Sequence, residues 1–209
     1  MSFIESFVQS LQATTIVEFI AVIFGIASVW FSKRENILVY PVGLVNTITY
    51  IYISIEGHLF GEATVNLYYT IVSIYGWILW SRRDRQQKPV VHITSSSKKE
   101  FAHQLLFFSF FFIVLFVCLN YLRQQFAPGV LPYADSFASA TAFTGMWLMA
   151  RKKVESWYWW IATNIASIPL YYVKGYAFTS VYYFILLLLA VSGLMEWRKK
   201  AKGYTNMIA

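Results

Sequence analysis

Long apolar runs recur through this 209-residue chain, and they constrain its fold more than any other feature of the sequence. Seven runs of roughly membrane-spanning length are separated by short charged or turn-like segments. Hydrocarbon offers no hydrogen bonds to an unpaired backbone, so such runs must be helical. The composition agrees, because 58% of the residues are hydrophobic, 13% are charged, and the mean hydropathy is +0.52. The sequence therefore predicts an all-α integral membrane protein.

Seven transmembrane helices are expected, and the fifth is the shortest. They cover residues 14–31, 36–55, 63–80, 101–122, 136–150, 156–173 and 178–196. The first ten residues contain Glu5 and no basic residue, so a cleavable signal peptide is not expected.

The basic residues alternate from one loop to the next. Fifteen of the seventeen Lys and Arg residues follow the first, third, fifth or seventh run, and only Arg123 and Lys174 fall on the other side. The positive-inside rule then places the N-terminus outside and the C-terminus in the cytoplasm. The net charge of +7 does not predict nucleic-acid binding, because the basic residues do not gather in one patch.

An amide stands in the middle of the sixth run. Trp157, Trp160, Asn164, Ser167 and Tyr171 follow at intervals of three or four residues and share one face of a helix. Asn164 lies about 10 Å along the axis from Trp157, near the bilayer midplane. An amide at that depth needs a partner, water or a ligand. We expect the stripe to face a substrate.

Two further amides lie inside apolar runs. Asn46 is near mid-depth in the second run, and Asn66 shares a face with Tyr69 in the third. Hydrogen bonding between helices is the alternative for all three Asn residues. For Trp157 and Trp160 the alternative is an aromatic belt at the inner interface. Tyr69, Tyr171 and Tyr183 are weaker candidates, for which packing is the alternative.

Several polar or aromatic residues are given structural interpretations. Glu18 is read as an interfacial or helix-starting carboxylate, and Trp77 with Trp80 as an interfacial belt. Cys118 has no partner for an intrachain disulfide, so a packing or lipid-facing role is expected. Residues 81–100 are basic and Ser-rich and predict a solvated cytoplasmic linker.

The second half of the chain resembles the first. Asn46 aligns with Asn164, and four further landmarks match: Gly57 with Gly175, Phe60 with Phe178, Gly76 with Gly193 after a one-residue gap, and Trp80 with Trp197. Chance alignment of hydrophobic segments is the alternative. One run separates the halves, so both have the same orientation and the repeat is parallel. The predicted division is a first three-helix repeat (1–81), a linker with a connecting helix (82–133) and a second repeat with a basic tail (134–209). Such repeats place a substrate near mid-membrane, between Asn46 and Asn164.

Motifs for chemistry are absent from the sequence. There is no phosphate-binding loop, no metal-ligand cluster and no nucleophile elbow. The runs hold no charged residue at mid-depth that would form a proton or sodium relay. A passive carrier or channel without a cofactor is therefore favoured over an enzyme.

Three motifs resemble the PnuC family of bacterial vitamin transporters. They are the WxxW of residues 157–160 with Asn164 four residues on, LYYVKG at 170–175, and YPVGLVN at 40–46. The resemblance covers essentially the whole chain. It implies a fold similar to the SWEET sugar transporters, a 3+1+3 arrangement, a homotrimer, and residence in the bacterial inner membrane. It also implies facilitated diffusion of nicotinamide riboside, trapped by a cytoplasmic kinase, while relatives carry thiamine or riboflavin.

The ligand that the resemblance implies matches the residues of the stripe. Nicotinamide riboside joins a flat pyridinium cation to a sugar, so indole faces and amides suit it. Trp157 and Trp160 are assigned to the ring, and Asn46, Asn66 and Asn164 to the ribose or carboxamide. The alternative from another class is a non-transporting membrane receptor or assembly subunit, whose aromatic stripe packs against a partner helix.

Overall fold

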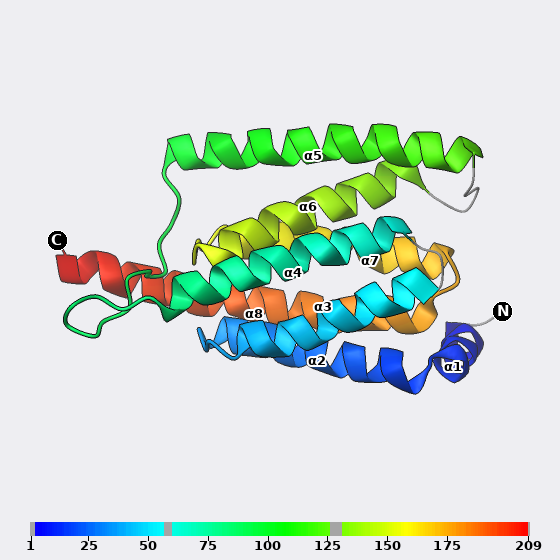
Figure 1. The fold of residues 1–209 in the computed structure, drawn as a ribbon, viewed down its shortest axis with the longest axis horizontal. Helices are drawn as coiled ribbons and strands as arrows, with labels where there is room; N and C mark the ends of the chain where they lie inside the picture. The colour runs from blue at the N-terminus through cyan, green and yellow to red at the C-terminus, as the bar shows by residue number, and fades with distance from the viewer. Residues whose placement is uncertain (1–2, 57–59, 126–130, 209) are drawn as a thin grey trace.

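The computed structural model describes residues 3–56, 60–125 and 131–208, which form eight helices, and all but the first run along one common direction (Figure 1). The helices are α1 (Phe3–Ala13), α2 (Ile16–Lys33), α3 (Val39–Glu56), α4 (Phe60–Ser81), α5 (Lys98–Gln125), α6 (Pro132–Ala150), α7 (Ser156–Val173) and α8 (Ala177–Ile208). The seven predicted helices correspond to α2 through α8. Gly57, one landmark of the repeat, lies outside the described residues.

Helix α1 corrects the predicted count, because the sequence indicated no helix before residue 14. It lies across the ends of α2 and α8 (Figure 1). The Ser10 hydroxyl accepts the backbone N–H of Phe178 at 3.2 Å, and the rings of Phe7 and Phe178 lie 6.1 Å apart. With eleven residues, α1 is too short to span a bilayer, which is why a search for spanning runs misses it.

Helix α2 begins at a capping box that confirms the interpretation of Glu18. The Glu18 backbone N–H donates to the Thr15 hydroxyl at 3.2 Å, and the Thr15 N–H donates to the Glu18 carboxylate at 2.7 Å. The two residues satisfy donors that the first turn of a helix leaves unpaired.

Three helices are long and apolar enough to cross a membrane by length and hydropathy alone. Within the described residues these are Ile16–Lys33, Lys98–Arg123 and Ala177–Tyr204. The lone Cys118 is exposed on α5, as predicted.

Six helices form a closed ring. Neighbours contact one another in the order α2, α3, α4, α6, α7 and α8, and α8 returns to α2. In the described part of the chain α3 and α7 do not contact each other, so they stand on opposite sides of the ring. Helix α5 lies outside it, against α6 (Figure 1).

Two tryptophans close one end of the ring by matched contacts. This end carries the 82–97 linker, the 151–155 turn and the C-terminal tail, and we call it the basic end. The Trp80 indole N–H donates to the Ala150 carbonyl at 3.0 Å, and the Trp197 indole N–H donates to the Ser32 carbonyl at 3.2 Å. The ring consists of two three-helix sets, α2 to α4 and α6 to α8. Each indole therefore reaches from the last helix of one set to the end of the first helix of the other.

The packing beside these indoles is matched as well. The Tyr40 ring meets Trp80 edge to face at 5.2 Å, and the Trp157 ring meets Trp197 in the same way at 5.5 Å. Tyr40 lies over Gly76 and Trp157 over Gly193, where a Cβ atom would stand 2.6 Å from the Tyr40 ring and 2.5 Å from the Trp157 ring. The division of the chain at residues 81 and 134 remains a prediction, and these paired contacts favour it.

Two structural interpretations need correction. Trp80 is 4% exposed, so it belongs to the core at the basic end and not to an interfacial belt, whereas Trp77 is 39% exposed. The linker is only half solvated: residues 82–88 are exposed, but Ile93 is buried. Beyond it, the Ser96 N–H and hydroxyl both donate to Glu155.

Replacing Gly193 with Ala should destabilise the fold. The added methyl would overlap the Trp157 ring, and overpacking of this kind costs about 1–3 kcal/mol. Thermal unfolding in detergent measures the effect. Gly203→Ala is the matched control on the same helix, because no atom lies within 4 Å of its added methyl. A Gly193→Ala protein as stable as the Gly203→Ala protein would contradict the packing described here.

Candidate functional site

The predicted amides lie at the middle of the ring, on the two helices that face each other across it. Asn46 is the eighth of eighteen residues in α3, and Asn164 is the ninth of eighteen in α7. Both helices begin at the basic end, so the two residues stand at similar heights.

Asn164 carries a polar atom with no partner. The residue is 2% exposed, and its side-chain oxygen has no hydrogen bond to any described residue. Its neighbour Thr163 is satisfied, since its hydroxyl donates to the Thr141 hydroxyl at 2.9 Å. A buried acceptor without a donor costs roughly 1–3 kcal/mol. A ligand that donates a hydrogen bond to this oxygen would remove that cost. Two other buried polar atoms of the described chain also lack a partner, the Tyr40 hydroxyl and the Trp157 indole nitrogen, but they lie in the core at the basic end.

Asn46 is held by the backbone of α2. Its side-chain amide donates to the Ala21 carbonyl at 2.7 Å. Gly25, one turn further along α2, makes room for this contact, because a Cβ atom there would lie 3.1 Å from the Asn46 amide nitrogen. The same Cβ would collide with the Tyr182 hydroxyl of α8. Gly25 thus lets Asn46 and Tyr182 approach each other.

Aromatic side chains from α4, α7 and α8 continue the site. The rings of Trp160 and Tyr69 lie 6.4 Å apart, and those of Tyr171 and Tyr183 stack at 5.1 Å with an interplanar angle of 17°. Trp160, Tyr69 and Tyr183 are each partly exposed.

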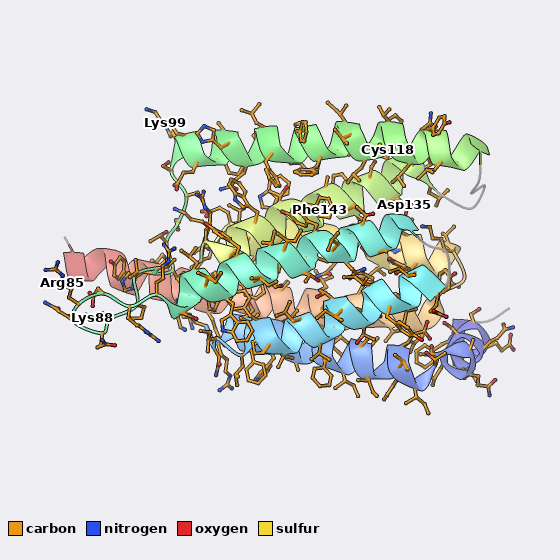
Figure 2. The ribbon with its side chains drawn as sticks, viewed as in Figure 1. Arg85, Lys88, Lys99, Cys118, Asp135 and Phe143 are labelled. Carbon is orange, nitrogen blue, oxygen red and sulfur yellow. The ribbon has the colours of Figure 1, made fainter. Side chains whose placement is uncertain are left out.

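Trp160 lies in the interior and not in lipid. Its ring packs on Gly145 of α6, where a Cβ atom would stand 3.2 Å from the indole nitrogen. Phe143, two residues before Gly145 on α6 (Figure 2), meets Tyr69 edge to face with the ring centres 5.9 Å apart. The glycine brings α6 and α7 together and turns the indole toward α4.

Trp157 does not join this group in the structure. It is 1% exposed, with Trp197 against its ring and Gly193 beneath it. Neither face is free for a ligand here, so its assignment to the ring of a substrate stays a prediction for another conformation. The interfacial belt considered for it does not fit a side chain in the core either.

Asn66 lies on α4 near the α3 contact. Its carbonyl accepts the Thr70 hydroxyl at 2.9 Å, and the oxygen of that hydroxyl lies 3.0 Å from the Thr47 hydroxyl of α3. The Asn66 side chain is partly exposed. Its proposed contact with a ligand stays a prediction.

Three residues near the predicted site carry no individual signal in the sequence. Tyr182 stands beside the predicted Tyr183, and Gly25 and Gly145 are single glycines inside apolar runs. A glycine in a predicted spanning helix does signal close packing, but the identity of the approaching residue depends on how the helices are arranged.

The site is neutral, and charge lies at the ends of the bundle. Arg85, Lys88 and Lys99 are at the basic end and Asp135 is toward the other (Figure 2), where Lys174 contacts it at 2.6 Å. The site residues offer amides, hydroxyls and aromatic faces. Such groups suit a planar cation with hydroxyls, because aromatic faces attract cations and amides both donate and accept.

A ring of helices around a neutral, aromatic and amide-lined middle is the architecture of a helical membrane transporter. The comparisons agree with this class. The chain belongs to the nicotinamide mononucleotide transporter family, whose sequence model matches residues 15–199. It is a multi-pass membrane protein and not an enzyme.

Named relatives cover most of the chain. The nicotinamide riboside transporter PnuC of Escherichia coli is 23% identical over 89% of this chain and 86% of its own. The riboflavin/roseoflavin transporter RibM of Streptomyces davaonensis is 24% identical over 84% and 81%. The crystal structure of the vitamin B3 transporter PnuC superposes with a TM-score of 0.71 at 20% identity, over 96% of this chain and 90% of that one, which establishes the shared fold.

The two central amides should differ in their effect on folding. Asn46→Ala removes the bond to Ala21 and should lower the stability by about 1 kcal/mol. Asn164→Ala removes an unpartnered oxygen and should leave the unfolding temperature unchanged or raise it. Thermal unfolding of both purified variants tests this. A large loss of stability in Asn164→Ala alone would favour a packing role for Asn164.

Proposed function

We propose that this protein imports nicotinamide riboside by facilitated diffusion. The observation that carries the proposal is the buried, unpartnered oxygen of Asn164 at mid-height in a ring of six helices. A hydroxyl or carboxamide N–H of the ligand would satisfy that oxygen. Trp160 and Tyr69 would present their aromatic faces to the pyridinium ring, as indoles and phenols do for cations.

Relatives support the vitamin class and leave two candidates among them. Three of the matching transporters are named for nicotinamide riboside and one for riboflavin and roseoflavin. Aromatic faces attract a cation even where the site holds no carboxylate. This attraction favours nicotinamide riboside over riboflavin, which is uncharged. Thiamine is also a cation, so it is the second cation to test.

The proposed topology has seven spans, with the basic end in the cytoplasm of a bacterial cell. The basic residues at that end support this orientation. The first helix, α1, would then lie at the outer surface, where its amphipathic sequence suits an interface. A cytoplasmic kinase would trap the substrate after uptake. A homotrimer is proposed as the assembly, which the mass of the detergent-solubilised protein would test.

Binding should depend on Asn164 and on the charge of the ligand. A titration of purified protein with nicotinamide riboside, thiamine and riboflavin in parallel should show the tightest binding for nicotinamide riboside. Asn164→Ala should weaken it about tenfold, the equivalent of one lost hydrogen bond.

Asn120→Ala is the matched control for this titration, because Asn120 is an exposed amide on α5 outside the ring. Tighter binding of riboflavin or thiamine would contradict nicotinamide riboside as the substrate, but the protein would still be a vitamin transporter. Binding that is equal in wild type and Asn164→Ala would overturn the site. No binding of any of the three would favour a receptor or assembly subunit.

Cells that produce this protein should take up nicotinamide riboside. Bacteria that depend on external nicotinamide riboside and lack their own transporter should grow when this protein is produced. Facilitated diffusion also requires that uptake persist when the proton gradient is collapsed, provided that the cytoplasmic kinase remains active. Uptake that stops with the gradient while kinase activity is intact would contradict a passive carrier.

A further inference from the structure

Two oppositely charged residues occupy equivalent places just after the first helix of each three-helix set. Glu35 follows the last turn of α2, and Lys152 follows the last turn of α6. Both have a left-handed backbone, with φ of 59° and 53°. Glycine usually takes this position because it has no Cβ atom to clash. A charged residue there retains its side chain at the expense of backbone strain.

The two side chains meet across the ring. The Lys152 ammonium lies 2.7 Å from one Glu35 oxygen, and the Lys200 ammonium of α8 lies 3.1 Å from the other. The Lys152 side chain is 5% exposed, whereas Glu35 keeps 25% of its side-chain surface accessible. The pair therefore lies at the boundary between the core and water.

The ion pair contacts the indoles that close the basic end. The Lys152 ammonium stands over the Trp80 ring at 4.6 Å, while Trp80 itself donates to the carbonyl of Ala150. Trp197 donates to the carbonyls of Ser32 and Lys33, just before Glu35. Contacts from α2, α4, α6 and α8 thus converge on one small cluster, which we call the basic-end latch: Glu35, Lys152, Lys200, Trp80 and Trp197.

Glu35 is charged at neutral pH in this setting. Burial by itself raises the pKa of the Glu35 carboxyl, but the hydrogen bonds and charges of Lys152 and Lys200 outweigh it and bring the pKa below its ordinary value. The attraction between the two halves is therefore present under physiological conditions.

We propose that the basic-end latch is the closure that must break for the substrate site to open toward that end of the ring. This inference rests on the proposed function, since a closure between halves has a role only in a protein that alternates its access. The side chains of the site lie deeper in the ring than the latch, which separates them from the water at the basic end. An ion pair at the edge of water suits a reversible closure, because both charges can be rehydrated when the halves separate.

A second ion pair provides a comparison. Lys174 lies 2.6 Å from Asp135, with 22% and 17% of their side chains exposed. Asp135 lies on α6 and Lys174 directly follows α7, so both residues belong to the same three-helix set. This pair is about as enclosed as the pair in the latch, but it does not join the two sets.

Accessibility of a single cysteine tests the latch without any substrate. Cys118→Ser removes the sole native thiol, and Ser73→Cys places a nearly isosteric reporter on α4. Ser73 is 3% exposed and lies one turn from both Tyr69 and Gly76, between the site and the latch. A membrane-impermeant maleimide is added to vesicles sealed with the basic end outward, and the rate of labelling is measured.

Lys152→Glu should speed labelling about tenfold, because two carboxylates then face each other and the closed state loses population. The double variant Glu35→Lys with Lys152→Glu keeps one acid and two bases in the cluster, and it should return the rate close to that of the reporter alone. Lys174→Glu should leave the rate unchanged. Lys152→Met, which keeps the apolar stem over Trp80, should give an intermediate rate and serves if Lys152→Glu does not fold.

Slow labelling in folded Lys152→Glu or Lys152→Met protein would overturn the latch, and so would a double variant that labels as fast as Lys152→Glu. The result is independent of the substrate. If labelling follows the charges while nicotinamide riboside does not bind, the latch stands and the proposed substrate fails. If nicotinamide riboside binds and labelling ignores the charges, the opposite holds.

Discussion

The hydrogen bonds from two indoles to helix ends hold this structure together. The last carbonyls of a helix have no partner within it, and in a membrane protein they are costly to leave unpaired. Trp80 satisfies the end of α6 and Trp197 satisfies the end of α2. Because each indole belongs to the other three-helix set, the bonds that complete the helix ends also join the two sets.

Strong closure at one end allows the middle of the ring to be polar. The core of large buried side chains lies at the basic end, around Tyr40, Trp157 and the two indoles. At mid-height the ring contains amides and tyrosines, among them the unpartnered oxygen of Asn164. Within the described residues, the Tyr40 hydroxyl and the Trp157 indole nitrogen of the basic-end core are unpaired as well, so the polar side chains at mid-height, more than one unpaired atom, distinguish the middle from that end. A tightly packed end beside a polar middle suits a transporter, since its ligand must be able to enter and leave.

Much of the fold and part of the site were predictable from residue patterns. Helices α2 to α8 follow from apolar runs, and the capping role of Glu18 follows from its place at a helix start. Helix α1 was missed because a short amphipathic segment lacks the hydropathy of a span. Trp80 was misread because a tryptophan before a basic cluster has the same pattern in an interfacial belt and in a core. Only the partner that its ring meets separates the two.

The sequence by itself determined the membrane class, helices α2 to α8 and the position of the central amides along their helices, because these depend on hydropathy and on the regular rise of a helix. The tertiary structure alone decided which aromatic residue faces what. Trp157 and Trp160 are three residues apart on one helix, yet one packs on Gly193 in the core and the other on Gly145 beside Tyr69. The same holds for the meeting of Glu35 and Lys152, residues 117 positions apart. Such pairings depend on the rotation and spacing of helices, which the periodicity of one helix does not contain.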